Sequence, residues 1–92
     1  QIVPGAQAVE TFFGPSVAVP KAQRLVQLAP WLEQSHQTLA QAQVRDGDFD
    51  EAAKAYRAAL PWAVTPAAKA RFEQAAADAL LSAERKRRNR DL

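Results

Sequence analysis

Ser35 and His36 are neighbours in the sequence, and His36 is the only histidine of the chain. Serine and histidine are the residue types of nucleophilic catalysis, which requires the hydroxyl and the imidazole to converge. Adjacent residues on a helix point about 100° apart and do not face each other. We therefore expect His36 to be a surface or groove-facing residue, and we expect no catalytic residue in this chain.

Asp46, Asp48 and Asp50 alternate as calcium ligands do, with Gly47 between the first two. An EF-hand loop also requires a glycine at its sixth position and a glutamate at its twelfth, and neither is present. Helix ends explain the pattern better: Gly47 can close one helix, and Asp48 can cap the next in a capping box with Glu51. Without cysteine and with one histidine, the sequence predicts no metal and no cofactor.

The basic residues are concentrated at the C-terminus. Residues 85–92 carry five basic side chains and one acidic one, for a net charge of +4, whereas the other 84 residues sum to −2. The cluster consists of Arg85, Lys86, Arg87, Arg88 and Arg90. Cations stabilise a helix C-terminus, and they also bind phosphate in RNA or in anionic lipid, or an acidic protein. No aromatic residue lies among them, so base stacking is not expected.

These residues must be positioned by one small domain, since the chain has 92 residues. Hydrophobic residues make up 48%, but 21 of them are alanine, which buries little apolar area. No apolar run approaches the roughly 18 residues that span a bilayer. The sequence thus predicts a thin core that depends on support from elsewhere.

Residues 1–20 are rich in proline and glycine, carry one charge and contain the pair Phe12 and Phe13. We expect an extended apolar arm that lies against the helices or against a partner, because glycine and proline at this density interrupt helices. The chain begins at Gln1 and contains no methionine. This favours a processed protein of an organelle or the periplasm, or an excerpt of a longer chain.

Residues 21–84 have helical periodicity, so the expected fold class is all-α. A short helix is predicted to end near Leu28, and a second to start at Pro30 or Trp31 and to end before Gly47. A third helix is predicted over about 50–60. Thr65 and Pro66 predict the start of a fourth helix, which runs to about Lys86 and is followed by the basic tail of residues 85–92.

The segment from Leu25 to Pro66 resembles a tetratricopeptide repeat, a helix-turn-helix unit of about 34 residues. With a repeat that starts at Glu33, the family's small, apolar and aromatic positions are occupied by Leu39, Ala40, Ala52, Tyr56 and Ala59. Residues 47–52 resemble the family's turn into its second helix. Pro30 stands at the closing proline of a preceding repeat, whereas His36, Gln43 and Val64 depart from the pattern.

The resemblance implies antiparallel helix pairs and a protein-binding scaffold without catalysis. The groove between the first helices of successive pairs would face a partner, with His36, Gln37, Gln41 and Gln43 as polar contacts. Trp31 and Trp62 each follow a proline at a helix boundary. We expect them to be core residues at the ends of the helix pairs, with exposed anchors for a partner as the alternative.

The preferred function is a protein interaction or assembly module within a larger protein or complex. The alternative is a structural accessory subunit, bound permanently in a large organellar or bacterial membrane assembly, whose basic tail contacts lipid head groups or RNA. A single repeat cannot bury its apolar face alone, so both interpretations require a protein partner.

Overall fold

The computed structural model describes residues 17–91, which contain helices and no strand. The helices are α2 (Val19–Leu28), α3 (Glu33–Arg45), α4 (Phe49–Ala59), the short 3-10 helix η1 (Leu60–Trp62) and α5 (Pro66–Asp91). The all-α fold class is therefore confirmed. Phe12 and Phe13, and most of the predicted arm, lie outside the described residues.

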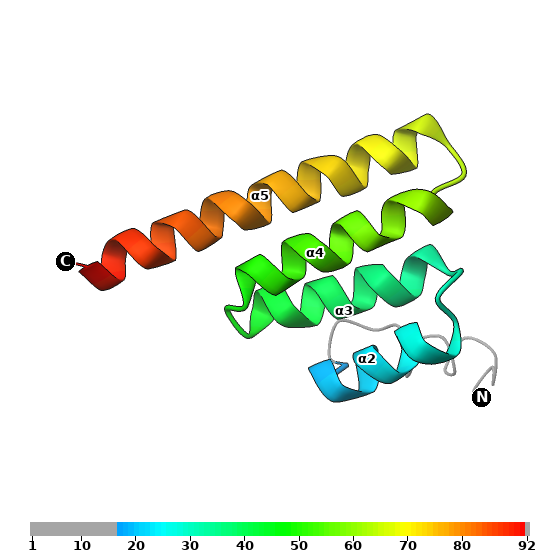
Figure 1. Cartoon of the computed structure of the whole chain (residues 1–92), viewed down its shortest axis with the longest axis horizontal. Coiled ribbons are helices and arrows are strands. Elements are labelled where there is room, and N and C mark those ends of the chain that lie inside the picture. The colour runs from blue at the N-terminus through cyan, green and yellow to red at the C-terminus, as the bar shows by residue number, and fades with distance from the viewer. Residues whose placement is uncertain (1–16, 92) are drawn as a thin grey trace, which may run out of the picture.

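The four α-helices form an antiparallel row in which each packs against its neighbour in the sequence (Figure 1). The loop from α2 to α3 and the connection from α4 to α5 lie at one end of the row. The α3–α4 turn lies at the other end, and α5 projects beyond it (Figure 1). Among the described helices, α3 and α4 are thus each packed between two neighbours, while α2 and α5 each pack against one.

The first described helix starts earlier than predicted. α2 begins at Val19, and Pro20 occupies its first turn, so the prediction of an extended chain up to residue 20 is wrong there. Proline lacks an N–H and has a helical φ, which suits a first turn. The preceding Val17 is buried, and its carbonyl oxygen accepts a 2.8 Å hydrogen bond from the Arg45 guanidinium.

The next helix starts later than predicted, at Glu33, and not at Pro30 or Trp31. Pro30 and Trp31 instead form a turn, in which the Leu32 N–H donates to the Ala29 carbonyl oxygen at 3.2 Å. α2 ends at Leu28, as predicted.

Gly47 closes α3 with a φ of 83°, as predicted. The Asp48 N–H donates to the Gln43 carbonyl and the Gly47 N–H to the Val44 carbonyl, at 2.8 and 3.0 Å, which is the pattern of a Schellman motif. The predicted capping box is wrong, because the Asp48 side chain makes no cap hydrogen bond. The Glu51 carboxylate instead accepts from Lys54 at 3.1 Å.

α5 starts as predicted, since the Thr65 hydroxyl oxygen accepts the Ala68 N–H at 3.1 Å. The helix does not end at Lys86, however, but continues to Asp91, so the predicted separate tail of residues 85–92 is wrong for its described part. No glycine or proline interrupts residues 67–91, and basic side chains in the last turns of a helix are electrostatically favourable.

The core between α4 and α5 is built almost entirely from alanine. One cluster contains Ala52, Ala53, Ala76 and Ala79, and the adjoining one contains Ala59, Ala63, Ala68 and Phe72. Tyr56 packs against both clusters. Phe72, Ala76, Ala79 and Ala83 of α5 are all buried. Small side chains let the helix backbones approach closely, but each contributes little apolar burial.

Candidate functional site

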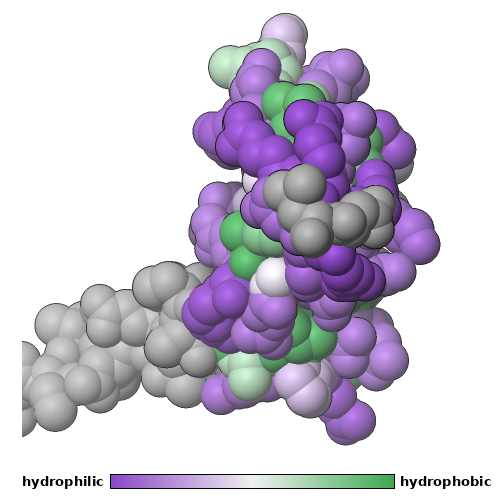
Figure 2. All heavy atoms as spheres, turned by 90° about the vertical axis from the view of Figure 1, so that its left-hand side faces the viewer, coloured by the Kyte–Doolittle hydropathy of each residue, from purple (hydrophilic) through white to green (hydrophobic). Residues whose placement is uncertain are grey.

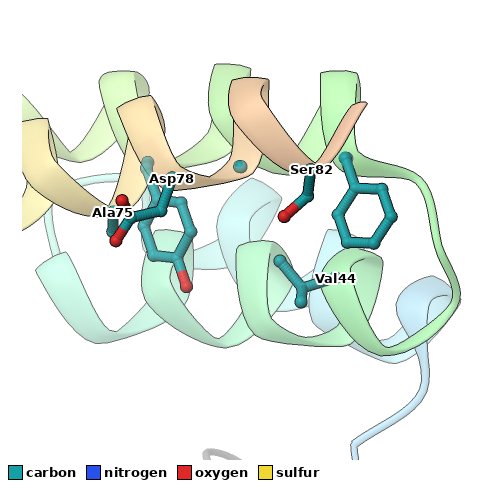
Figure 3. A pocket seen from close by; sticks show the side chains of 7 residues that line it. Val44, Ala75, Asp78 and Ser82 are labelled. Atoms are coloured by element: carbon teal, nitrogen blue, oxygen red, sulfur yellow. The ribbon is translucent and has the colours of Figure 1, made fainter. Parts of the chain in front are cut away.

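A groove lies between α3 and α5, with α4 as its floor (Figure 3). Its volume is about 210 Å³, and its lining consists of Val44, Phe49, Tyr56, Ala75, Asp78, Ala79 and Ser82. Figure 3 shows Val44 of α3 across from Ser82 of α5, with Ala75 and Asp78 nearer the start of α5. The groove thus separates α3 from α5.

Two aromatic rings from α4 form the floor of this groove. Phe49 and Tyr56 are both half-buried, and the Tyr56 ring lies 6.5 Å from the buried Phe72 ring at an angle of 36°. Burial raises the pKa of the Tyr56 hydroxyl above its ordinary value of 10.0. The floor is therefore rigidly supported by the core, and it offers a neutral hydroxyl that can donate or accept.

Polar groups occupy the α5 side of the groove. The Asp78 carboxylate accepts a 3.0 Å hydrogen bond from the Gln74 amide, and Ser82 adds a half-buried hydroxyl. Beyond the groove, the Lys86 ammonium lies 6.0 Å from the Phe49 ring centre and donates to the Gly47 carbonyl oxygen at 2.8 Å. An apolar floor with a few polar groups along one edge is typical of a surface that receives apolar side chains.

The polar contacts predicted for this groove do not line it. His36 and Gln43 are buried, with exposed fractions of 5% and 6%, so the prediction that they contact a partner is wrong. α3 is packed between α2 and α4, and the His36 Nε2 atom lies 2.7 Å from the Pro30 carbonyl oxygen. Gln37 is half-buried and Gln41 is exposed.

Trp31 and Trp62 converge at the end of the molecule that carries the α2–α3 loop and the α4–α5 connection (Figure 1). They are 58% and 44% exposed, so the prediction that they are core residues is wrong. Together with Leu32, Glu33, Gln34 and Val64 they line a hollow of about 280 Å³, which we call the tryptophan hollow.

The basic residues near the C-terminus lie at the opposite end. Lys86 donates to Gly47 in the α3–α4 turn, and Arg87 forms a 3.1 Å ion pair with Asp50 in the first turn of α4. Arg88 lies 3.8 Å from Glu84. Arg85 and Arg90 are exposed. Figure 2 faces this end and shows a predominantly hydrophilic surface. The cluster is thus part of a helix that is fastened to the body of the protein.

A third hollow lies between α4 and α5 and is larger, at about 340 Å³. Its lining is partly apolar and consists of Arg57, Leu60, Glu73, Ala76, Ala77 and Leu80. Nearby on α5, Leu81 is 52% exposed. This part of α5 thus carries apolar side chains that no described helix covers.

The described residues contain no group of three or more histidine, cysteine or acidic side chains that could hold a metal ion. Ser35 and His36 are both buried on α3, and the Ser35 hydroxyl and His36 Nδ1 have no hydrogen-bond partner within residues 17–91. None of the helices described for residues 17–91 combines the length and the apolar character needed to cross a membrane.

Comparison with family models, with curated proteins and with solved structures gives no match.

Proposed function

We propose that this chain is a tetratricopeptide-like, non-catalytic protein-interaction module whose α3–α5 groove binds a segment of a partner protein. The observation that carries the proposal is the groove itself, in which two aromatic rings of α4 form a floor between α3 and α5.

The packing of α3 against α4 supports the tetratricopeptide-like assignment. The two helices occupy Glu33–Arg45 and Phe49–Ala59, the spans expected for a repeat that starts at Glu33. Ala40, Ala52 and Ala59 have exposed fractions of 0%, as the small-residue positions of such a hairpin require. The aromatic position, Tyr56, fills the space beside them and reaches the groove.

The size of the groove favours a side chain of a macromolecule over a small-molecule substrate. Its 210 Å³ lies below the roughly 300 to 1,000 Å³ of typical ligand pockets. The occupant we propose is a bulky apolar side chain of a partner segment, placed next to a hydrogen-bond donor. The ring faces of Phe49 and Tyr56 would receive the apolar group, and the Asp78 carboxylate would accept from the donor.

The uncovered apolar hollow beside Leu60 and Leu80 supports a place for this module within a larger protein or complex. In a helical row of this kind each hairpin buries its apolar face against the next one. A further helix, from a partner or from additional repeats, would cover α5 at this hollow.

Selection from a random twelve-residue peptide library tests the groove directly. Enriched peptides are titrated into isotope-labelled protein, and the expected result is that NMR signals of Phe49, Tyr56 and Ser82 shift. Ser82→Phe fills the groove and should weaken these peptides at least about tenfold, as truncation or blocking of an interface hot spot does.

The matched control is Ala70→Phe, which places the same ring on an exposed position of α5 outside the groove. It should leave peptide affinity unchanged. Peptides that bind both variants equally, or a library that yields no binder shifting groove signals, would contradict the proposal.

A further inference from the structure

The tryptophan hollow has an unusual charge environment. The segments that form this end, residues 28–34 and 60–66, contain one charged residue, Glu33, and no basic one. Glu33 is half-buried in the first turn of α3 and lines the hollow beside Trp31 and Trp62. Its carboxylate makes no hydrogen bond or ion pair among residues 17–91. The hollow therefore combines two exposed indoles with one negative charge that has no counter-ion.

Indole rings attract cations more strongly than other aromatic side chains do, because the face of the ring is electron-rich. A carboxylate beside the rings adds a direct ionic contact. The N-terminus of α3 opposes this attraction with about half a positive charge, which the full negative charge of Glu33 outweighs. The lining of the hollow, with two indoles and one carboxylate, thus favours a cation that also has apolar or planar surface.

We propose that the tryptophan hollow is a second binding site, separate from the α3–α5 groove, for an arginine side chain flanked by apolar residues in a partner peptide. The guanidinium group stacks on the indole faces of Trp31 and Trp62 and pairs with the Glu33 carboxylate. Leu32 and Val64, which are 37% and 88% exposed, receive the flanking apolar side chains. Arginine fits better than lysine because its planar, weakly hydrated head group both stacks and forms paired hydrogen bonds.

Intrinsic fluorescence provides a selective readout, because Trp31 and Trp62 are the only tryptophans of the chain. The probe is the blocked tripeptide leucine-arginine-leucine, compared with a counterpart in which citrulline replaces arginine. Citrulline has nearly the same shape without the charge. We expect a saturable fluorescence change and about tenfold tighter binding of the arginine peptide, within the range of cation–π contacts.

Glu33→Gln should reduce the preference for arginine over citrulline to about twofold or less, because only the cation interacts with the carboxylate. The matched control, Glu73→Gln, removes an exposed carboxylate on α5 outside the hollow and should keep the full preference. Circular dichroism of each variant verifies that the helices are intact.

Three results would overturn the proposal. Equal affinity for the two peptides would indicate a site that recognises apolar or proline-containing segments and does not recognise the positive charge. A fluorescence change with protein concentration alone, accompanied by dimers in sedimentation, would assign the hollow to a second copy of the chain. No response to either peptide would remove the site altogether, while leaving the α3–α5 groove to be judged by its own NMR signals.

Discussion

Tyr56 connects the core of this protein with its surface. Its ring packs against both alanine clusters and lies beside Phe72, while the residue also lines the α3–α5 groove. A smaller residue at this position would leave a gap between helices that alanines cannot fill. The same ring thus contributes to the stability of the helix pair and to the shape of the proposed binding surface.

The titration of Tyr56 is a direct test of its burial, because it is the only tyrosine of the chain. Desolvation raises its pKa above 10.0 in the folded protein. The folded state therefore prefers the neutral form, and this contribution to stability is full below about pH 10 and is lost as the pH rises through the folded pKa. We expect the phenolate absorbance of native protein to rise at higher pH than that of urea-unfolded protein.

In Tyr56→Phe the ring has no hydroxyl to ionise, so the loss of stability that ionisation of Tyr56 causes above about pH 10 should be absent. The measurement is the free energy of unfolding by denaturant as a function of pH. Coincident titration curves for native and unfolded protein would show that the hydroxyl is fully hydrated in the folded state.

At the scale of helices and turns, the α3–α4 connection depends on the left-handed conformation of Gly47. This conformation lets two backbone N–H groups bond to the last carbonyls of α3, and it aims α4 back along α3. The Gly47 carbonyl oxygen also receives the Lys86 ammonium, which fastens α5 to the same turn. Gly47 therefore helps to determine how α3, α4 and α5 are placed relative to one another.

Gly47→Ala should destabilise the protein by about 1 to 2 kcal/mol, because a left-handed conformation is strained for alanine. The added Cβ would also lie 3.3 Å from the Lys86 ammonium, whose flexible side chain can move. The free energy of unfolding in urea is the measurement. Gly47→Asn is the matched variant and should cost less, since asparagine tolerates this conformation. Equal stability of the alanine variant and the parent would mean that the turn rearranges.

The sequence predicted those helix ends that carry a local signal. Gly47 ends α3, and Thr65 with Pro66 begins α5, because these residues act on the backbone within a few positions. The end of α5 carries no such signal, and the run of basic residues at 85–90 does not reveal that the helix continues through it. Their contacts to Gly47 and Asp50 join positions almost 40 residues apart, which local patterns do not contain.

The proposed sites were predicted less well for the same reason. The resemblance and their polar character placed His36 and Gln43 in a groove at the surface, whereas the packing of α3 between α2 and α4 buries them. Trp31 and Trp62 are large and apolar, so the sequence placed them in the core. Only the fold shows that the two loops carrying them meet at one end of the row.

In the molecule as a whole, the hydrophobic core contains few large apolar side chains. Among the buried hydrophobic residues of the described chain, Val17 and Phe72 are the ones that are not alanine. Larger apolar groups are instead displayed on the surface, among them Leu28, Trp31 and Leu81. A fold of this composition gains less from burial than most domains of its size and more from being covered by a partner.

We therefore expect the isolated chain to unfold with a free energy below about 5 kcal/mol, the lower end for folded domains. Thermal melting followed by circular dichroism at micromolar concentration should give a low and broad transition. A sharp, cooperative transition of a dilute monomer would contradict the idea that this protein depends on its surroundings for stability.

The length of α5 has a consequence for avidity. Its 26 residues span about 39 Å, and this rod runs from the end that holds the tryptophan hollow to the arginine-rich end. Two ligands held at these ends are kept about 4 nm apart. The root-mean-square length of a flexible connecting segment matches this distance at roughly 50 residues, whereas a fully extended segment reaches it with about 12. Connections too short to span the distance would favour bridging between two molecules, whereas connections near the matching length would favour binding of both ends by one partner chain.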